Sequence, residues 1–335
     1  MPTSLQAPFT GEHFPLGATA LPHYDVAIVG GGPVGSFCAL AHARKGARVA
    51  LLEANPKAVQ RLAGEWLHPP AVSMLRSVGV NLDGRPGFFP GKGFVVFPED
   101  RSESILLPYP AETTGLVFEH SALVSHLHEA VENESGIDVF HHARARAIED
   151  EGIVFGFNGT ECLLQARRIV GADGRASIVR QSLGLTTDRM TCSRMIGVMA
   201  EGVNLQHEGF GYVVLGGPGP ILTVPLGKDR VRIIADMPLD HWTPRERIGV
   251  LLESYAACLP EDLKCGFEAA LRKGKFQAAA NELRPRISYG NSRRVLIGDA
   301  AGHYHPMTAA GMTLGFGDAL ALAEGGISGI SRTGA

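Results

Sequence analysis

The sequence predicts an α/β fold in which a Rossmann-like domain, with βαβ units and a mainly parallel sheet, carries an inserted domain built on an antiparallel sheet. Residues 25–53 read as a strand, a glycine-rich turn, a helix and a second strand without interruption. Two later apolar strands, within residues 168–173 and 294–299, each run into a turn that contains an aspartate. Short strand-like runs divided by Gly and Pro lie between them, and this spacing favours an antiparallel sheet over further βαβ units.

The turn after the first strand has the spacing of a dinucleotide-binding fingerprint. Gly30, Gly32 and Gly35 fit G-x-G-x-x-G. The first glycine makes the sharp turn, the second lets the backbone approach a pyrophosphate, and the third lets helix and strand pack closely. Pro33 and Val34 begin the helix, whose N-terminal amides and dipole attract phosphate. A glycine fingerprint alone is weak evidence, but here both strands and the helix are in place.

An acidic residue ends the second strand. Glu53 follows the apolar run 49–52, about 20 residues after the glycine turn, as the fingerprint requires. We expect its carboxylate, with Ala54 beside it, to meet the ribose of an adenosine. A carboxylate accepts hydrogen bonds from a free 2′-hydroxyl, so the site suits FAD or NAD better than NADP.

Composition limits the function classes. The 335 residues have room for two domains, and 45% hydrophobic and 19% charged residues are typical of a folded globular protein. A formal charge of −3 provides no basic field for nucleic acid. Five cysteines without C-x-x-C spacing predict reduced thiols in a cytoplasmic protein. No apolar run of about 18 residues is present, so no transmembrane segment is expected, while contact with a membrane stays open.

Local patterns also predict the helices. Residues 1–23 lack the basic and apolar regions of a secretory signal and are expected to form a loose leader. Two prolines suit the start of a helix over 69–79, and apolar spacing predicts another over 121–133. Thr243 opens a capping box for a helix whose apolar stripe extends to residue 255.

The strand-like runs are short. They cover residues 94–97, 105–109, 137–140, 143–148, 153–157, 168–172, 196–203, 212–215, 221–224 and 231–235. Residues 83–93 hold four glycines and two prolines and are expected to cross between the domains. We therefore assign a discontinuous dinucleotide-binding domain and an inserted substrate domain. The first comprises residues 24–90, 109–186 and 291–335, and the second comprises residues 91–108 and 187–290.

The two aspartate turns are further candidate sites. A D-G-x-x-S-x-x-R segment begins at Asp173 and ends at Arg180, directly after a buried strand. Gly298 and Asp299 follow another apolar strand near the end of the chain. Either pair alone is more often a plain turn. Two such turns behind a glycine fingerprint are harder to dismiss.

Taken in chain order, the three signatures resemble those of the FAD-dependent monooxygenases of the para-hydroxybenzoate hydroxylase fold, over about residues 24–325. The resemblance implies that FAD is the resident cofactor and that the glycine turn binds its ADP part. It also implies that the Asp173 segment borders FAD and a transient nicotinamide site, while Asp299 binds the flavin-side ribose.

Within that fold the chain looks most like squalene epoxidase and related isoprenoid-directed flavoproteins. The resembling segments are GEWLHP at 64–69, LPYP at 107–110, FEH at 118–120 and HPMTAAGMT at 305–313. Common aromatic hydroxylases have Arg where His120 stands, and a loop ending in G-x-N where residues 311–313 stand. These two departures favour the epoxidase branch.

The resemblance implies that a flavin C4a-hydroperoxide transfers one oxygen atom from O2 to a lipophilic, isoprenoid or prenylated substrate, by epoxidation or hydroxylation. The protein then positions the rings and excludes water, and the helix starting near Gly311 stabilises the reduced flavin anion. The candidate catalytic residues are Tyr109, His305, Pro306, Gly311 and Met312. The candidate FAD contacts are Gly30, Gly32, Pro33, Val34, Gly35, Glu53, Ala54, Arg61, His120, Asp173, Gly174, Gly298, Asp299, Gly311, Met312 and Thr313.

The electron donor and the metal content follow from what the motifs lack. No second glycine fingerprint is present, so NAD(P)H either binds transiently near Asp173 or acts through a reductase partner. His303 and His305 have no third ligand close in sequence, and we expect no metal site there. For Tyr109, a buried tyrosine with one satisfied hydrogen bond is an equal alternative to a role in the pocket.

Two other functions stay open. The same fold also serves hydroxylases of aromatic rings. The family continues past the last helix into C-terminal helices that cover the substrate pocket, whereas this sequence ends at Ala335. A truncated, non-catalytic flavin-binding protein is therefore the alternative from another class.

Overall fold

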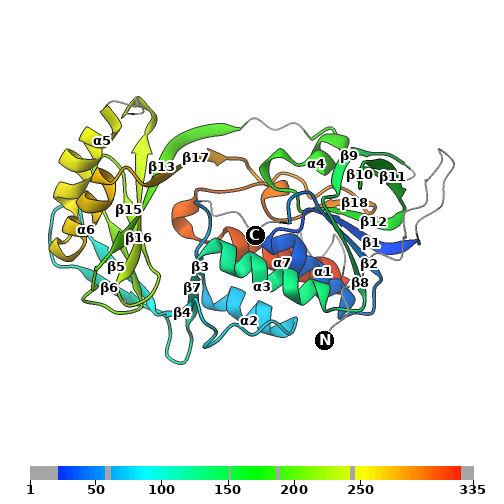
Figure 1. The fold of residues 1–335 in the computed structure, drawn as a ribbon, viewed down its shortest axis with the longest axis horizontal. Coiled ribbons are helices and arrows are strands. Elements are labelled where there is room, and N and C mark those ends of the chain that lie inside the picture. The colour runs from blue at the N-terminus through cyan, green and yellow to red at the C-terminus, as the bar shows by residue number, and fades with distance from the viewer. Residues whose placement is uncertain (1–21, 57–61, 151, 186–188, 242–245, 326–335) are drawn as a thin grey trace.

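A computed structural model describes residues 22–56, 62–150, 152–185, 189–241 and 246–325. The predicted α/β class is confirmed, because a parallel sheet covered by helices lies beside a second, larger sheet (Figure 1). Arg61, the Thr243 capping box and residues 1–21 of the expected leader lie outside the described residues.

The parallel sheet has the order β18-β12-β1-β2-β8, and all its neighbouring strands run parallel. Its strands are β1 (Tyr24–Val29), β2 (Val49–Glu53), β8 (Ile137–His141), β12 (Ala166–Gly171) and β18 (Arg294–Leu296). Helices α1 (Pro33–Ala43), α3 (His120–Glu132) and α7 (Gly311–Gly325) cover one face, with Phe37 and Phe316 stacked at 4.4 Å between α1 and α7. The sheet of β9 (Arg144–Ile148), β10 (Ile153–Phe157) and β11 (Thr160–Leu164) covers the other.

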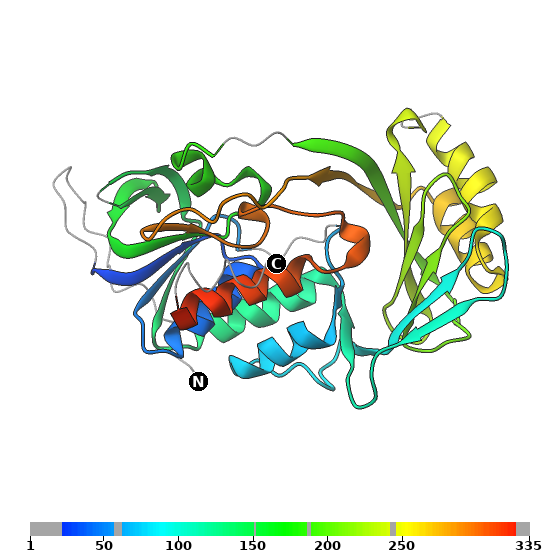
Figure 2. The same ribbon diagram turned by 180° about the vertical axis from the view of Figure 1, so that it is seen from behind.

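The larger sheet, here called the substrate sheet, has the order β17-β13-β16-β15-β14-β5-β6. Its strands are β5 (Gly93–Phe97), β6 (Ile105–Pro108), β13 (Met190–Glu201), β14 (Phe210–Val214), β15 (Ile221–Pro225), β16 (Arg230–Pro238) and β17 (Phe276–Leu283). Helices α5 (Glu246–Val250) and α6 (Glu261–Arg272) cover its outer face, and β13 and β17 extend toward the parallel-sheet part (Figure 2). The expected antiparallel pairing holds except between β14 and β5, which pair in parallel. Strand β5 comes from an earlier part of the chain and is not joined to β14 by a hairpin.

Several sequence predictions need correction. Residues 83–93 are not only a crossing, because β4 (Phe88–Gly91) buries Phe88 and pairs with β7 (Gly115–Phe118), which also pairs with β3 (Trp66–Leu67). The strand expected over 196–203 begins earlier, at Met190. The predicted apolar stripe ending at residue 255 is divided between α5 and a π-helical turn. The helix predicted after the two prolines is present as α2 (Pro69–Ser77).

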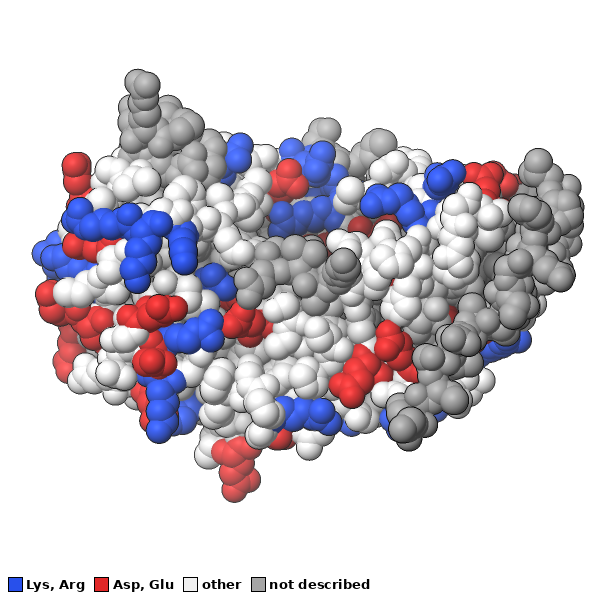
Figure 3. Space-filling model, viewed as in Figure 1, with Lys and Arg blue, Asp and Glu red and all other residues white. Residues whose placement is uncertain are grey.

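Charged side chains of both signs lie next to one another at the substrate-sheet end of the face seen in Figure 3. This mixture agrees with the small net charge of the sequence. In the described part of the chain, no helix is both long enough and apolar enough to cross a membrane.

Strand β16 joins the two parts through its inner face, the face turned away from α5 and α6. Val231, Ile233 and Ala235 point into the core beneath those helices, so the alternating residues between them face the parallel-sheet part. Three of these inner residues bond to that part, and we call them the β16 clasp: Arg230, Arg232 and Asp236.

The central contact of the clasp is a buried ion pair. The Arg232 guanidinium donates two hydrogen bonds to Glu65, at 3.0 and 3.1 Å. The two side chains are only 10% and 2% exposed. Burial raises the pKa of Glu65, and the nearby Arg232 opposes that effect. The carboxylate therefore depends on its arginine for compensation of the lost solvent.

We expect Arg232→Met to lower the free energy of unfolding by about 3–5 kcal/mol, because Glu65 would remain buried without its partner. Urea unfolding of the purified protein measures the loss. Adding Glu65→Leu should recover much of it, since an apolar pair of similar volume carries no desolvation cost.

Arg146→Met is the matched control, because Arg146 and Glu161 form an ion pair that is 62% and 60% exposed. Its loss should cost less than about 1 kcal/mol. Equal destabilisation by the two arginine variants would contradict the buried role of Arg232.

Candidate functional site

The glycine turn and the two aspartate turns meet at the ends of β1, β12 and β18. Gly30 has φ +101°, and a Cβ there would lie 2.7 Å from the Ala172 carbonyl oxygen. A Cβ on Gly35 would lie 1.8 Å from the Gly30 oxygen. A Cβ on Gly298 would lie 3.2 Å from a methyl group of Val34. The structure therefore brings all three predicted motifs into contact.

Three side chains fix the peptide groups of Gly31. Its N–H donates to Glu53 Oε2 at 2.7 Å, and its carbonyl accepts from Ser36 Oγ at 3.0 Å and His128 Nε2 at 2.7 Å. His128 lies on α3, and no motif pointed to it. Next to this clamped peptide, a Cβ on Gly32 would meet nothing within 4 Å, and no side chain caps α1 there. The turn therefore holds open space at a helix N-terminus, where a phosphate binds favourably.

The Asp173 turn has a polar atom without a partner. Its Oδ2 accepts the Ile178 N–H at 2.7 Å, whereas Oδ1 is buried and has no hydrogen-bond partner among the described residues. Burial raises the pKa of this carboxyl group. The 3-10 turn that follows starts at Gly174, and the Arg180 guanidinium donates to the Ala300 carbonyl at 3.0 Å, which ties this turn to the second one.

A side chain of α7 fixes the backbone of the Asp299 turn. The Gly298 N–H donates to Asp318 Oδ2 at 2.9 Å, and Asp318 also pairs with Arg286 at 2.8 Å. Asp299 itself stays 42% exposed, with Arg175 Nε at 3.6 Å. The carboxylate at this position is thus available to a ligand while its backbone is fixed.

A second cluster surrounds Tyr109. The Trp66 indole N–H donates to Tyr109 Oη at 2.9 Å, so the Tyr109 hydroxyl can donate its proton to His68 Nδ1 at 2.5 Å. His68 Nε2 then carries a proton and donates to the Thr308 carbonyl at 3.0 Å. Burial raises the pKa of Tyr109. This chain of hydrogen bonds joins the segments of residues 64–69, 107–110 and 305–313.

The segment 305–313 leads into α7 and lies beside this series of hydrogen bonds. Ala309 has φ +50°, a left-handed conformation that is uncommon for a residue with a side chain and frequent at ligand sites. Gly311 begins α7 and leaves the space of a Cβ open, and Thr313 Oγ1 is buried without a partner in the described part of the chain. A Cβ on Gly64 would lie 2.8 Å from Met312 Cε, so the two segments touch.

Two predicted histidines are used by the protein itself. His120 is buried, and its Nδ1 lies 3.2 Å from the Gly64 carbonyl. His305 precedes Pro306, accepts the Met307 N–H at Nδ1 and lies 3.3 Å from Asp236 through Nε2. Burial lowers the pKa of His303. Within the described residues, no group of three His, Cys, Asp or Glu side chains could hold a metal ion.

FAD fits the residues present. The open space at Gly32 suits the pyrophosphate, and the Glu53 carboxylate, which accepts the Gly31 N–H, suits the adenosine ribose. The partnerless Asp173 Oδ1 and Thr313 Oγ1 are polar atoms that ligand hydroxyls or ring atoms would satisfy. Asp173 belongs to the glycine and aspartate turns and Thr313 to the segment beside Tyr109, so one cofactor that satisfies both atoms would join these two regions.

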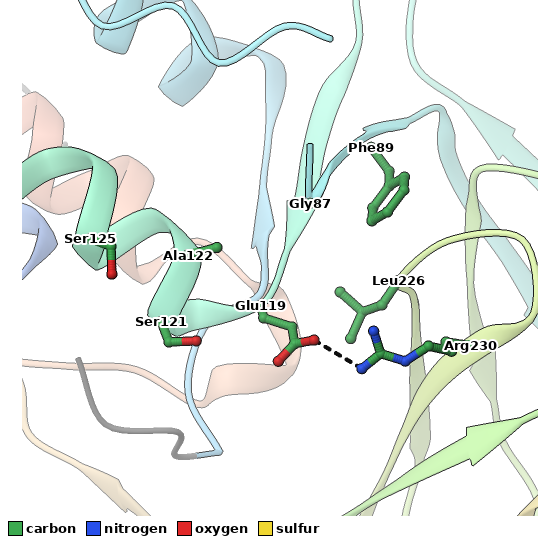
Figure 4. Close-up of a pocket in the computed structure, with 8 residues that line it drawn as sticks. All are labelled: Gly87, Phe89, Glu119, Ser121, Ala122, Ser125, Leu226 and Arg230. Carbon is green, nitrogen blue, oxygen red and sulfur yellow. Dashed lines mark hydrogen bonds and ion pairs between the residues drawn. The ribbon is translucent and has the colours of Figure 1, made fainter. Parts of the chain in front are cut away.

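A cavity of about 320 Å³ lies where α3, β4 and the β15–β16 hairpin meet (Figure 4). It is lined by Gly87, Phe89, Glu119, Ser121, Ala122, Ser125, Leu226 and Arg230. None of the predicted site residues that the structure describes lines it. The Glu119–Arg230 ion pair, at 2.9 Å, crosses between the two parts of the chain there.

Comparison with known proteins supports the same assignment. The family described as FAD binding domain matches residues 23–325. Squalene epoxidase erg1 of Aspergillus fumigatus is 30% identical over 324 residues, covering 90% of this chain and 66% of that protein. Squalene monooxygenase SE2 of Panax ginseng is 27% identical over 312 residues, covering 88% of this chain and 56% of that protein. The chain thus spans about half to two thirds of the length of these relatives.

Solved structures give the fold. PqsL of Pseudomonas aeruginosa superposes with a TM-score of 0.75 at 24% identity, covering 90% of this chain and 85% of that one. The resemblance to FAD-dependent monooxygenases and the likeness to squalene epoxidases, inferred above from the motifs, are confirmed by these matches.

We expect Gly32→Ala to weaken FAD binding by about tenfold or more while leaving apoprotein stability unchanged. The added methyl group has room in the protein but occupies the position that a pyrophosphate needs. Quenching of FAD fluorescence gives the dissociation constant, and thermal unfolding of the apoprotein gives the stability.

Gly249→Ala in α5 is the matched control, since a Cβ there also meets nothing within 4 Å but lies on the far side of the substrate sheet. It should bind FAD as the parent protein does. Unchanged FAD affinity in Gly32→Ala would contradict the placement of the phosphates.

Proposed function

Because this chain belongs to the FAD-binding domain family, matched over residues 23–325, we propose that it is an FAD-dependent monooxygenase that inserts one oxygen atom from O2 into a lipophilic, isoprenoid or prenylated substrate. The likeness to squalene epoxidases supports the reaction class. Bound FAD supplies the activation of oxygen, whereas the protein binds and orients the reactants and excludes water.

One observation carries the lipophilic part of the proposal: an apolar row on β5 and β6 leads to Tyr109. Leu107 pairs with Phe94, and Ile105 pairs with Val96. Residues directly opposite in an antiparallel pair share a face, and Phe94 packs on Trp66 at 4.7 Å. Ile105 and Leu107 therefore face the parallel-sheet part, yet they remain 52% and 51% exposed.

Exposed apolar side chains in a continuous row mark an interaction surface. A lipophilic chain lying on this row would bury Ile105 and Leu107 and end near the Tyr109 hydroxyl. That hydroxyl is oriented by Trp66 and His68, so it presents a fixed polar group at the end of an apolar path.

The remaining candidate residues would hold the cofactor across the two clusters. Gly32 and Glu53 suit its adenosine end, and Asp173 and Asp299 suit hydroxyl groups farther along. The N-terminal amides of α7, from Gly311, would stabilise negative charge on the ring system. We further propose NAD(P)H as electron donor, either bound transiently near Asp173 or acting through a reductase.

The defining experiment supplies FAD, NAD(P)H and labelled dioxygen, with and without a reductase. A monooxygenase incorporates one labelled atom into the product of a prenylated or isoprenoid alkene. Product from an aromatic ring of matching size, with none from the alkene, would favour the aromatic-hydroxylase alternative. Purified protein that cannot be loaded with FAD would contradict both enzyme functions, and FAD-loaded protein without any product would favour a non-catalytic flavin-binding protein.

Tyr109→Phe should retain FAD but lower kcat by about tenfold, because the hydroxyl that connects Trp66 and His68 is lost. Steady-state kinetics and the flavin absorbance of the purified protein separate the two effects. Tyr304→Phe, at a 55% exposed tyrosine five residues before Ala309, is the control and should leave both unchanged. Loss of FAD from Tyr109→Phe, or full turnover, would refute the assigned role.

A further inference from the structure

We propose that Asp236 is a positioning residue: together with Ser193 and Asn281 it holds His305, and through His305 it fixes the segment 305–313 relative to the substrate sheet. This inference rests on the proposed function, in which that segment borders the flavin.

Four side chains form the cluster. Asp236 Oδ1 accepts from Ser193 Oγ at 2.6 Å and from Asn281 Nδ2 at 2.7 Å. Asp236 Oδ2 lies 3.3 Å from His305 Nε2. Ser193, Asp236 and Asn281 are 6%, 8% and 1% exposed. Two donors therefore converge on one buried carboxylate, and His305 Nε2 lies beside them, 3.2 Å from Ser193 Oγ.

The protons define the orientation of the His305 ring. Its Nδ1 accepts the Met307 N–H at 3.3 Å, so Nδ1 carries no proton in this arrangement. Nε2 must then carry the proton, and it lies 3.2 Å from Ser193 Oγ and 3.3 Å from Asp236 Oδ2. Nδ1 is bonded within the turn that contains His305, and Nε2 lies against the substrate sheet. The imidazole ring, and with it the start of the segment 305–313, therefore has one orientation.

The surroundings indicate that this cluster sets a position rather than adding stability. Apart from Ser193 and Asn281, the inner-face residues around Asp236 are apolar: Ile234 on the same strand, Met195 opposite it, and Ala279 beyond Met195. A buried carboxylate among them is costly even when paired, and apolar residues of similar volume would usually be at least as stable. The presence of this polar cluster among apolar residues is best explained by the orientation it gives to His305.

The backbone next to the cluster is also irregular. The pairing of β13 with β17 shifts register between Thr191 and Ser193, so Cys192 is an extra residue. A β-bulge of this kind re-aims the neighbouring side chain, and such bulges are frequent beside active sites. Here the shift precedes the serine that bonds to Asp236.

The other two clasp residues do not reach the segment 305–313. Arg230 pairs with Glu119 at the edge of the cavity in Figure 4, where its side chain is 43% exposed. Arg232 bonds to Glu65. Asp236 is the clasp residue that contacts this segment, and its position four residues beyond Arg232 on the same face sets the spacing between the two contacts.

Asp236→Asn tests the proposal. An amide has a single acceptor oxygen and brings its own N–H donors, so it cannot accept from Ser193 and Asn281 and also keep an oxygen beside His305 Nε2. In apoprotein labelled with 15N-histidine, we expect the parent to show His305 as one tautomer with the proton on Nε2, and the variant to lose that preference. The Met307 amide should exchange with solvent faster in the variant. In the FAD-loaded enzyme, kcat should fall about 10- to 100-fold while KM and FAD affinity stay close to the parent values.

Ser193→Ala is the second variant, and it should change the tautomer and the Met307 exchange in the same direction but less, even if Asp236→Asn fails to fold. Asp229→Asn, at an exposed carboxylate just before β16, is the matched control and should change nothing. Parent-like tautomer and exchange in the folded variants would overturn the proposal, as would a lower melting temperature with unchanged kcat. If the parent enzyme forms no product, the proposed function fails, whereas the tautomer and exchange measurements on the apoprotein still decide the role of Asp236.

Discussion

The close approach of backbone segments at the glycine turn is the constraint on which the rest of the structure depends. Gly30 lies against the peptide before Asp173, and Gly35 lies against the Gly30 carbonyl, at distances that no Cβ could occupy. Val34, between them, packs on the Gly298 backbone. The positions of both aspartate turns are therefore set by contact with this one turn. Open space at Gly32 remains because its neighbours, rather than Gly32, make these contacts.

The second constraint is polar and acts across the two parts of the chain. Alternation along β16 places Arg230, Arg232 and Asp236 on the face that an ordinary two-layer sheet would fill with apolar residues. Arg230 and Arg232 gain their carboxylate partners only after the sheet has docked, and Asp236, which already bonds to Ser193 and Asn281 within the sheet, then gains His305. Burying an unpartnered charge is costly. These charged residues therefore disfavour a misdocked sheet more strongly than apolar residues at the same interface would. Compared with an apolar interface, the clasp thus gives less stability but defines how the substrate sheet and the parallel-sheet part are positioned.

Much of the fold could be predicted from local pattern, whereas most contacts of the site could not. The strand, turn and helix of residues 25–53 are specified by glycines and apolar runs within one segment. In contrast, His128 reaches Gly31 across 97 positions, Arg232 reaches Glu65 across 167, and His68 reaches Thr308 across 240. Sequence pattern records which side of an element is apolar, but it does not record which distant group a polar side chain meets. Strand β17 was missed for a related reason, since FQAAANEL has no β-branched residue and is a strand through its pairing with β13.

The two ends of the site consequently differ in how they are built. At the glycine turn, the groups that suit the cofactor are mainly backbone amides and one carboxylate, all fixed by steric contact within short motifs. Around Tyr109 and His305, the groups are side chains that come from four separate segments and depend on one another through hydrogen bonds. Backbone geometry survives substitution of most side chains, and a fold shared with PqsL at 24% identity agrees with this. A chain of side-chain hydrogen bonds changes with any of its members. Under the proposed function, substrate choice could therefore diverge at the Tyr109 end while the dinucleotide end keeps the same cofactor.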